Sequence, residues 1–396
     1  MATIIDMKNS PLSYVELLKG NLIHNIKQFR NLAKRGTKFS VAVKGNAYGH
    51  GQNLVAKILE PYVDYFQIDS VEELELLRKI TKKKTFLFGY AQKNDLKKVV
   101  KLGCILSVFS LEQLLTLSAI AKSVNLIQEV HIPIDAFLGR EGFLLSELPK
   151  VLTEIKKYKY IKLTGIYAHF ANIEDTNNFT HAKKQIKVFN QAINLAKKFG
   201  FNKLQTHISA TSGLLVYEKN KGINPIIRLG IGVYGLWPSE HIKFLYKNKM
   251  ELKPVMSWKT KIAQIKILSA GRTIGYGLSF MTYEETKIAI IPQGYADGLD
   301  RGFSNNGFVL IGGTRCKILG RVMMNMFVAD VSHLPKVKIE DEVVILGKQD
   351  KEPARNALGI ADAGGEITAE EMAKRIDTIN YEITTRISAL LPRVVI

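Results

Sequence analysis

Cysteine is scarce in this chain of 396 residues, which contains only Cys104 and Cys316. The two lie far apart, each in an apolar run, and neither has neighbours at the spacing of metal ligands. Two isolated thiols cannot supply the disulfide framework of a small secreted protein. We therefore expect buried, reduced thiols, no metal site and a cytoplasmic location.

Long apolar runs are also missing, since no stretch approaches the roughly 20 residues that a membrane-spanning helix needs. The opening Met-Ala-Thr-Ile-Ile-Asp-Met-Lys lacks the basic and apolar order of a secretion signal. Hydrophobic residues make up 46% of the chain, a value typical of globular proteins. The composition therefore favours a globular protein without a membrane partner.

Acidic residues are outnumbered, 36 against 56 lysines and arginines, which gives a formal net charge of +20. Such an excess can indicate a nucleic-acid or membrane surface, so its distribution matters. The densest clusters carry no interleaved aromatic residues and fall mostly on the polar faces or ends of expected helices: 82–84, 97–101, 156–157, 183–184 and 197–198. We interpret them as solvated helix faces and expect no nucleic-acid partner.

Lys44 differs from the other lysines in its position. An apolar run through Phe39, Val41 and Val43 ends at Lys44, and small residues follow in Gly-Asn-Ala-Tyr-Gly-His-Gly. A single lysine is most often a solvated side chain before a loop. An amine at the rim of a sheet can also form a Schiff base, and the surrounding pattern has to decide between the two.

Eight strand-like runs alternate with amphipathic helical segments over the first 245 residues. Helical spacing of apolar residues predicts helices at 18–35, 70–82 and 181–198, among others. Eight units in about 200 residues fit a closed (β/α)8 barrel better than the alternative, an open doubly wound sheet. The runs are 38–44, 64–69, 85–89, 104–109, 127–135, 161–170, 203–210 and 226–229.

Polar residues follow the ends of five runs, namely Lys44, Arg140, His169, Thr211 and Gly230. Barrels of this kind place their chemistry at the C-terminal ends of the strands, often with a phosphate site after strands seven and eight. The stretches 209–213 and 228–232 fall there and offer hydroxyl groups and unobstructed backbone amides. Either stretch alone is more often an ordinary turn.

The pattern changes past residue 245, where alternating runs at 255–267, 286–291, 308–311 and 342–346 have no long helices between them. A capping box at Thr368 predicts one late helix, to about Asp377. We predict an α/β chain in which a barrel (1–245) precedes a mostly β domain (246–396), and residues 1–17 can pack with the second domain.

Taken in order, the motifs of the chain resemble those of alanine racemases, which are fold-type III pyridoxal-phosphate enzymes. The resemblance covers nearly the whole chain. Its landmarks are Ala42-Val43-Lys44-Gly45-Asn46-Ala47-Tyr48-Gly49-His50-Gly51, Gly139-Arg140-Glu141-Gly142, His169-Phe170-Ala171, Arg228-Leu229-Gly230-Ile231-Gly232-Val233-Tyr234-Gly235, Ile274-Gly275-Tyr276-Gly277, Gly294-Tyr295-Ala296-Asp297-Gly298 and Thr378-Ile379-Asn380-Tyr381-Glu382.

The resemblance implies that Lys44 binds pyridoxal 5'-phosphate covalently and is one of two catalytic bases. Tyr276 would be the second base and would reach the active site of the partner subunit in a head-to-tail homodimer. Two bases on opposite faces suffice to remove and return the proton on Cα. The implied activity is the interconversion of L- and D-alanine, which supplies D-alanine for cell-wall peptidoglycan.

The remaining implied roles concern the cofactor and the substrate. The phosphate would be held by Tyr48, Thr211, Gly230, Ile231 and Tyr381. His169 would lie against the cofactor, and Arg228 would bind its pyridine nitrogen. Arg140 and the backbone of Met324 would contact the substrate. Alone, Tyr276 and Tyr381 could be packing residues and His169 a core histidine, but their joint order favours a site.

Three positions depart from the family pattern. Pro133 replaces a lysine that many members carbamylate and whose negative charge orients Arg140, so we expect a bound anion or Asp135 to take that role. Ala210 replaces an asparagine, and Asn325 replaces an aspartate beside the substrate. A serine or broad-specificity racemase therefore stays an alternative. So does a non-catalytic pyridoxal-phosphate homeostasis protein, although such proteins lack a second domain.

Overall fold

The computed structural model describes residues 11–218, 225–349 and 365–396. The chain divides into two compact units. The barrel unit comprises residues 20–47 and 55–253. The strand-rich unit comprises 48–54 and 254–396 together with the segment that ends at Lys19. The sequence places the boundary near residue 245, and in the structure the chain enters the strand-rich unit for the last time at Pro254.

Eight parallel strands form the sheet of the barrel unit, in the order β8-β7-β6-β5-β4-β3-β2-β9. At its open edge the N–H of Arg228 donates to the carbonyl of Ser209 (3.0 Å), so the ring nearly closes. The predicted (β/α)8 barrel is confirmed, and each expected run contains one strand. These are β2 (Lys38–Ala42), β3 (Tyr65–Ile68), β4 (Thr85–Leu87), β5 (Ile105–Ser107), β6 (Gln128–Pro133), β7 (Ile161–Tyr167), β8 (Gln205–His207) and β9 (Ile226–Leu229).

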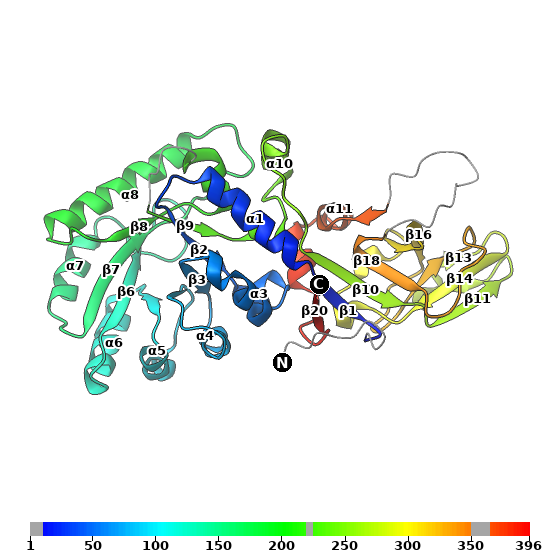
Figure 1. Cartoon of the computed structure of the whole chain (residues 1–396), viewed down its shortest axis with the longest axis horizontal. Coiled ribbons are helices and arrows are strands. Elements are labelled where there is room, and N and C mark those ends of the chain that lie inside the picture. Colours follow the sequence, from blue (N-terminus) through cyan, green and yellow to red (C-terminus); the bar gives the residue numbers. More distant parts are fainter. Residues whose placement is uncertain (1–10, 219–224, 350–364) are drawn as a thin grey trace. The chain divides into compact units, whose positions relative to one another are not determined.

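Helices follow the barrel strands and lie outside the ring (Figure 1). Local sequence sets where they begin: the hydroxyl of Ser70 accepts from the N–H of Glu73 (3.2 Å), and Ser110 caps its helix in the same way. The three predicted helices are present as α1, α4 and α8. The helices are α1 (Lys19–Leu32), α3 (Gln52–Leu59), α4 (Val71–Arg78), α5 (Leu96–Leu102), α6 (Leu111–Ser123), α7 (Leu148–Lys156), α8 (Thr180–Lys198) and α10 (Glu240–Tyr246). The short segments α2 (Lys44–Tyr48) and α9 (Thr211–Gly213) directly follow barrel strands, and α2 has left-handed backbone angles.

The inside of the barrel is apolar at one end and polar at the other. Tyr65, Phe86, Ile105 and Ile226 form a buried cluster near the N-terminal ends of their strands, and the rings of Tyr65 and Phe86 stack at 4.8 Å. Buried histidines and an arginine occupy the strands farther along. The apolar end stabilises the barrel, which leaves the C-terminal end for chemistry.

The strand-rich unit is built on a sheet in the order β11-β14-β17-β16-β15-β18-β10-β1-β20. Its β1 (Tyr14–Leu17) pairs antiparallel with β10 (Met256–Lys261) and parallel with β20 (Arg393–Val395). The other strands are β11 (Gln264–Leu268), β12 (Thr273–Ile274), β13 (Phe280–Met281), β14 (Thr286–Ile291), β15 (Phe308–Ile311), β16 (Thr314–Leu319), β17 (Phe327–Asp330), β18 (Glu342–Lys348) and β19 (Glu366–Ile367). The mostly β character predicted for this part is confirmed.

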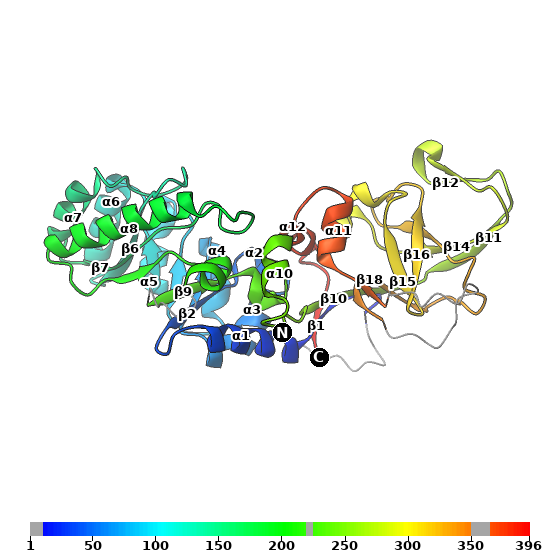
Figure 2. The ribbon, with the colours of Figure 1, turned by 90° about the horizontal axis from the view of Figure 1, so that it is seen from above.

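Two short helices, α11 (Ala369–Arg375) and α12 (Asn380–Thr385), pack against each other in this unit (Figure 2). The hydroxyl of Thr368 accepts from the N–H of Glu371 (3.1 Å), which confirms the predicted cap. Of the segment 1–17, the first ten residues lie outside the described part of the chain, and the rest contains β1. Cys104 and Cys316 are both buried and free, as expected.

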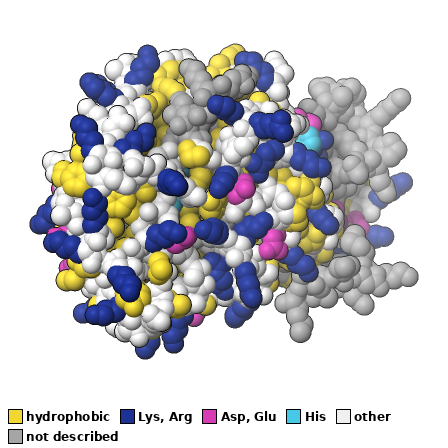
Figure 3. All heavy atoms as spheres, turned by 60° about the vertical axis from the view of Figure 1, so that its left-hand side comes forward, with side chains coloured by type: hydrophobic (Ala, Val, Ile, Leu, Met, Phe, Trp, Pro, Cys, Tyr) yellow, Lys and Arg dark blue, Asp and Glu magenta, His cyan; other side chains and the backbone are white. Residues whose placement is uncertain are grey.

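One face of the barrel unit shows how its basic side chains are distributed (Figure 3). Figure 3 shows lysine and arginine side chains scattered over the face of the barrel unit, among apolar and neutral groups, without one dominant patch. Within residues 11–218, 225–349 and 365–396, no helix is long and apolar enough to cross a membrane.

Candidate active site

Lys44 begins a left-handed turn just after β2. The φ angles of Gly45, Asn46, Ala47 and Tyr48 are 61°, 52°, 56° and 52°. Residues other than glycine adopt this conformation at a cost of roughly 1–2 kcal/mol each. The backbone after Lys44 is therefore held in place by its surroundings rather than by its own preference.

Two acidic residues hold the Lys44 turn. The carboxylate of Glu73 accepts from the N–H of Gly45 (2.6 Å) through one oxygen and from the N–H of Asp69 (2.8 Å) through the other. Asp69 in turn lies 3.5 Å from Nζ of Lys44. The sequence motifs did not identify either residue. The available signal was that Asp69 ends the second strand-like run, where the barrel rule expects functional groups.

Arg228 lies on β9 with its guanidinium buried inside the barrel, and the residue is only 5% exposed. Its Nη1 donates to Nδ1 of His207 (2.7 Å). Its Nη2 donates to the carbonyl of Ala168 (2.7 Å) and to Nδ1 of His169 (3.0 Å). Burial lowers the pKa of Arg228 to about 10, so the guanidinium is still charged at neutral pH.

The partners of Arg228 are neutral histidines with defined tautomers. Because a guanidinium can only donate, Nδ1 of His207 and Nδ1 of His169 must accept, and each ring carries its proton on Nε2. Nε2 of His207 then donates to Nδ1 of His131 (2.9 Å). Burial and the charge of Arg228 lower the pKa of His131 to about 3 and hold that of His207 well below its ordinary value.

Aromatic rings pack around the guanidinium of Arg228. Tyr167 stacks on His207 with 5.1 Å between ring centroids and 5° between planes, and its hydroxyl is hydrogen-bonded to that of Ser107 (2.6 Å). Cζ of Arg228 lies 5.2 Å from the centroid of the Tyr167 ring, within range of a cation–π contact. Together with its hydrogen bonds, these contacts fix the orientation of the Arg228 guanidinium.

His169 lies within electrostatic reach of Arg228 and of two other predicted site residues, Arg140 and Lys44. Burial is the main cause that lowers its pKa to about 3, and the positive charges of Arg228, Arg140 and Lys44 add to the effect. All three cations are therefore within electrostatic reach of one imidazole. The structure brings these four predicted residues to the same end of the barrel.

Thr211 and Gly230 meet after strands β8 and β9. The N–H of Gly230 donates to the hydroxyl of Thr211 (3.2 Å), and Ile231 opens a short 3₁₀ helix, Ile231–Tyr234. A Cβ at Gly232 would lie 2.5 Å from the ring of Phe29 and 2.7 Å from the methyl of Thr211, so close packing requires glycine there. The result is a cluster of hydroxyl and amide donors suited to an anion.

Arg140 follows β6 and is paired with Glu141. The Glu141 carboxylate accepts from Nε of Arg140 through one oxygen and from Nη2 (2.8 Å) through the other. Oδ1 of Asp135, the residue that the sequence offered as a partner for Arg140, accepts from the N–H groups of Leu138 and Gly139 (3.0 Å each). Asp135 therefore shapes the loop that carries Arg140. An orienting role of Asp135 or of a bound anion stays a prediction.

The other predicted site residues lie in the strand-rich unit. The rings of Tyr48 and Tyr381 meet there with centroids 5.9 Å apart. Tyr276 is 70% exposed on a short 3₁₀ helix, Tyr276–Leu278, and Met324 is 55% exposed. The approach of these four residues to the barrel residues stays a prediction.

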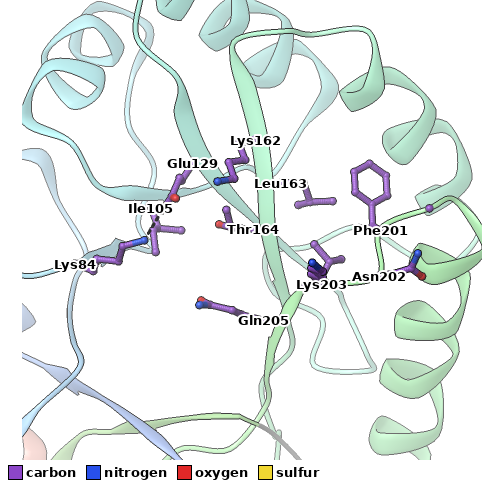
Figure 4. A pocket seen from close by; sticks show the side chains of 12 residues that line it. Lys84, Ile105, Glu129, Lys162, Leu163, Thr164, Phe201, Asn202, Lys203 and Gln205 are labelled. Carbon is purple, nitrogen blue, oxygen red and sulfur yellow. Dashed lines mark hydrogen bonds and ion pairs between the residues drawn. The ribbon is translucent and has the colours of Figure 1, made fainter.

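A cavity of about 630 Å³ lies elsewhere. It opens between the N-terminal ends of β4 to β8 and is lined by residues such as Lys84, Glu129 and Lys203 (Figure 4). None of the predicted site residues lines it. This end of a barrel usually serves stability, so we place the active site at the opposite end.

Family comparisons agree with this geometry. The model of the alanine racemase N-terminal domain matches residues 19–238, and that of the alanine racemase C-terminal domain matches residues 255–395. An alanine racemase of Leptospira interrogans is 35% identical over 397 residues, which cover 98% of this chain and 97% of that protein. The chain belongs to the alanine racemase family.

Solved structures of family members are similar over nearly their whole length. One is an alanine racemase from Clostridium difficile 630, with a TM-score of 0.87 and 30% identity over 98% of this chain and 96% of that one. Another is the alanine racemase of Bacillus anthracis with bound L-Ala-P, with a TM-score of 0.88 and 29% identity over 98% and 95% of the two chains. Alanine racemases are isomerases that depend on pyridoxal phosphate.

The donor set of the barrel end fits that cofactor. Lys44 offers an amine for its aldehyde, and Arg228 offers N–H groups that can only donate to a ring nitrogen. The hydroxyl of Thr211 accepts from the N–H of Gly230 and still has its own proton to donate, so this hydroxyl and the amide of Ile231 are suitable for a phosphate. An aldehyde, an aromatic nitrogen and a phosphate are the three polar features of pyridoxal phosphate, and each has a matching group.

Proposed function

We propose that the chain interconverts L-alanine and D-alanine by a two-base mechanism, and that it supplies D-alanine for cell-wall peptidoglycan. The observation that carries this proposal is the position of Lys44. It follows the first barrel strand on the same end as Arg228 and His169, and a turn of left-handed residues fixes the backbone next to it. That arrangement distinguishes Lys44 from the many solvated lysines of the chain.

Lys44 and Tyr276 are the two proposed bases. Racemisation requires that one group removes the Cα proton on one face and that another returns a proton on the other face. The Nζ atom of Lys44, 3.5 Å from Asp69, is the group we assign to the first face. The hydroxyl of Tyr276, an exposed residue, is the group we assign to the second, and exposure within one chain is what a residue that serves a partner subunit needs.

The other residues bind and orient. We propose that Tyr48, Thr211, Gly230, Ile231 and Tyr381 hold the phosphate and that Arg228 donates to the pyridine nitrogen. When bound, pyridoxal phosphate stabilises negative charge on Cα. Because Arg228 keeps its proton at neutral pH, it leaves the ring nitrogen unprotonated, and we propose that this limits side reactions. His169 packs beside it as a neutral acceptor.

The neighbouring candidate functions rest on fewer observations. A serine or broad-specificity racemase is favoured only by Asn325, in place of an aspartate beside the substrate. A non-catalytic homeostasis protein is disfavoured by residues 254–396, which carry Tyr276 and match the C-terminal domain of the family. We therefore keep alanine as the proposed substrate.

We also propose a head-to-tail homodimer in the cytoplasm. The dimer is supported by the exposure of Tyr276 and Met324, both of which need another surface to act on a substrate. The cytoplasm is supported by Cys104 and Cys316, which are buried and unpaired as in proteins of reducing compartments.

The test is to incubate the purified protein with pyridoxal phosphate and each L-amino acid in heavy water. We expect deuterium at Cα and formation of the D-enantiomer with alanine, and little of either with larger amino acids. Activity with serine but not with alanine would show that the proposed substrate is wrong and that the chain is a serine racemase. No exchange with any amino acid would contradict the enzymatic assignment.

Two variants test the assignment of the bases. Lys44→Ala should abolish racemisation in both directions, because it removes a base and the covalent attachment of the cofactor. Tyr276→Phe should lower the rate by about 100-fold or more while the cofactor still binds. Full activity of Tyr276→Phe with either enantiomer would contradict the two-base proposal. Tyr283→Phe, at another exposed tyrosine of the same unit, is the matched control.

A further inference from the structure

Arg140 poses a problem of orientation. Its side chain is 53% exposed, and a long exposed arginine samples many rotamers. At position 133, where many family members carry a carbamylated lysine, this chain has proline, which has no amine to modify. The charge that fixes Arg140 must therefore come from a bound anion or from another group of the chain.

Glu141 is placed to supply that charge. Its two carboxylate oxygens accept from Nε and Nη2 of Arg140, the bidentate geometry that best fixes a guanidinium. The Glu141 side chain is only 26% exposed, so its position is better defined than that of Arg140. Within the described residues no hydrogen bond uses Nη1 of Arg140. That atom is left to donate to a substrate.

The pair lies within electrostatic reach of residues inside the barrel. The charges of Arg140 and Glu141 both act on Tyr167 and on Arg228, which lie inside the barrel. The loop that carries the pair is held by Asp135, because its Oδ1 accepts from the N–H groups of Leu138 and Gly139. A mobile surface ion pair would be worth little, but this pair is bidentate and its loop is anchored.

We propose that Glu141 is a positioning residue that holds Arg140 ready for the carboxylate of an α-amino acid, in place of a carbamylated lysine. This rests on the proposed function, in which Arg140 contacts the substrate. The Glu141 carboxylate neutralises one side of the guanidinium, and Nη1 presents the other side to the substrate. A permanent carboxylate makes this arrangement independent of dissolved carbon dioxide.

The experiment compares the wild-type holoenzyme with Glu141→Ala and Glu141→Gln. We expect Glu141→Ala to raise KM for both alanine enantiomers about tenfold and to change kcat by less than threefold, because orientation for binding is lost while the bases remain. Glu141→Gln keeps one oxygen that can accept from Arg140, so its KM should lie between that of the wild type and that of Glu141→Ala. Glu147→Ala is the matched control, since Glu147 accepts from the N–H of Leu144 (2.8 Å) on the same loop.

A binding measurement separates orientation from catalysis. Propionate has the carboxylate and methyl of alanine but no amine, and its affinity for each holoenzyme can be measured by calorimetry. We expect about tenfold weaker binding to Glu141→Ala and unchanged binding to Glu147→Ala. Tighter propionate binding or a lower KM in Glu141→Ala would overturn the proposal, because Glu141 would then only offset the charge of Arg140. Unchanged values would overturn it as well.

The two proposals fail in different ways. A wild-type holoenzyme that racemises no amino acid would contradict the proposed function whatever Glu141 does. A wild-type enzyme that racemises alanine, with Glu141→Ala indistinguishable from it in KM and in propionate affinity, would contradict only the role of Glu141. Circular dichroism and thermal unfolding of each variant show whether the fold is retained.

Discussion

Nη1 of Arg228 and Nδ1 of His207 lie 2.7 Å apart inside the barrel, in a contact that only one tautomer of the histidine allows. Because Nε2 of His207 then carries the proton, Nδ1 of His131 must accept from it, and the tautomer of His131 is fixed as well. Within the described residues, Nε2 of His131 has no hydrogen-bond partner. The orientation of Arg228 thus depends on two fully buried histidines.

These histidines predict how stability depends on pH. The pKa values of His131 and His169 fall to about 3, and that of His207 is also lowered, whereas unfolded histidines titrate near 6.5. Below about pH 6.5 these histidines therefore bind protons in the unfolded chain but stay neutral in the folded chain. We expect the free energy of unfolding to fall by up to about 1.4 kcal/mol per pH unit for each histidine as pH drops from 6.5 toward 3.

Urea denaturation between pH 7.5 and pH 5 measures that slope. His131→Gln should remove the contribution of one buried histidine and so give a shallower slope than the wild type. An identical slope in His131→Gln and the wild type would show that His131 is not a neutral buried group.

Thr211→Val tests the proposed phosphate site. The change removes the hydroxyl that meets the amide of Gly230 and keeps the shape of the side chain. We expect the dissociation constant of pyridoxal phosphate to rise about tenfold, the effect of losing one hydrogen bond to a charged group. Absorbance titration of the apoprotein measures it. Thr211→Ser should retain wild-type affinity, and equal affinity in the valine variant would exclude a role for the hydroxyl.

Gly232→Ala should destabilise the barrel unit by about 1–3 kcal/mol, since the added Cβ overlaps Phe29 and Thr211. The matched control is Gly20→Ala in α1, where a Cβ meets nothing within 4 Å. That change should stabilise the helix by about 0.5–1 kcal/mol. Urea unfolding compares the two, and a neutral Gly232→Ala would mean that Phe29 can move aside.

Bicarbonate should have no effect on activity. Pro133 cannot be carbamylated, and Arg140 already has Glu141 as its partner. We expect equal racemisation rates in buffer depleted of carbon dioxide and in buffer with added bicarbonate, with sodium chloride matching the ionic strength. Stimulation by bicarbonate would indicate a carbamate at some other amine.

Periodicity predicted most of the barrel from the sequence, because a buried parallel strand is a short apolar run bounded by turns. Each of the eight runs contains one strand. The polar residues at the strand ends could be placed for the same reason, since parallel strands all end at one rim. Lys44, His169 and Thr211 follow from this rule without knowledge of any neighbour.

Pairings between distant or adjacent residues could not be predicted in this way. The apolar run of β1 gives no sign that its partners are β10 and β20, because strand pairing depends on long-range topology. The motif Gly139-Arg140-Glu141-Gly142 does not reveal the role of Glu141, since its pairing with Arg140 depends on the loop that Asp135 shapes. The roles of Asp69 and Glu73 emerge only once the left-handed turn is seen.

The pairing of β1 has a consequence for synthesis of the protein. From β2 to β8 each barrel strand pairs with the next one along the chain, and β9 returns to β2, so the barrel can form once residues up to β9 have been made. In contrast, β1 is made before all of them but pairs with β10 and β20, which are made after the barrel is complete. Until then its apolar residues lack their partners, and the nascent chain carries an unpaired strand throughout most of its translation.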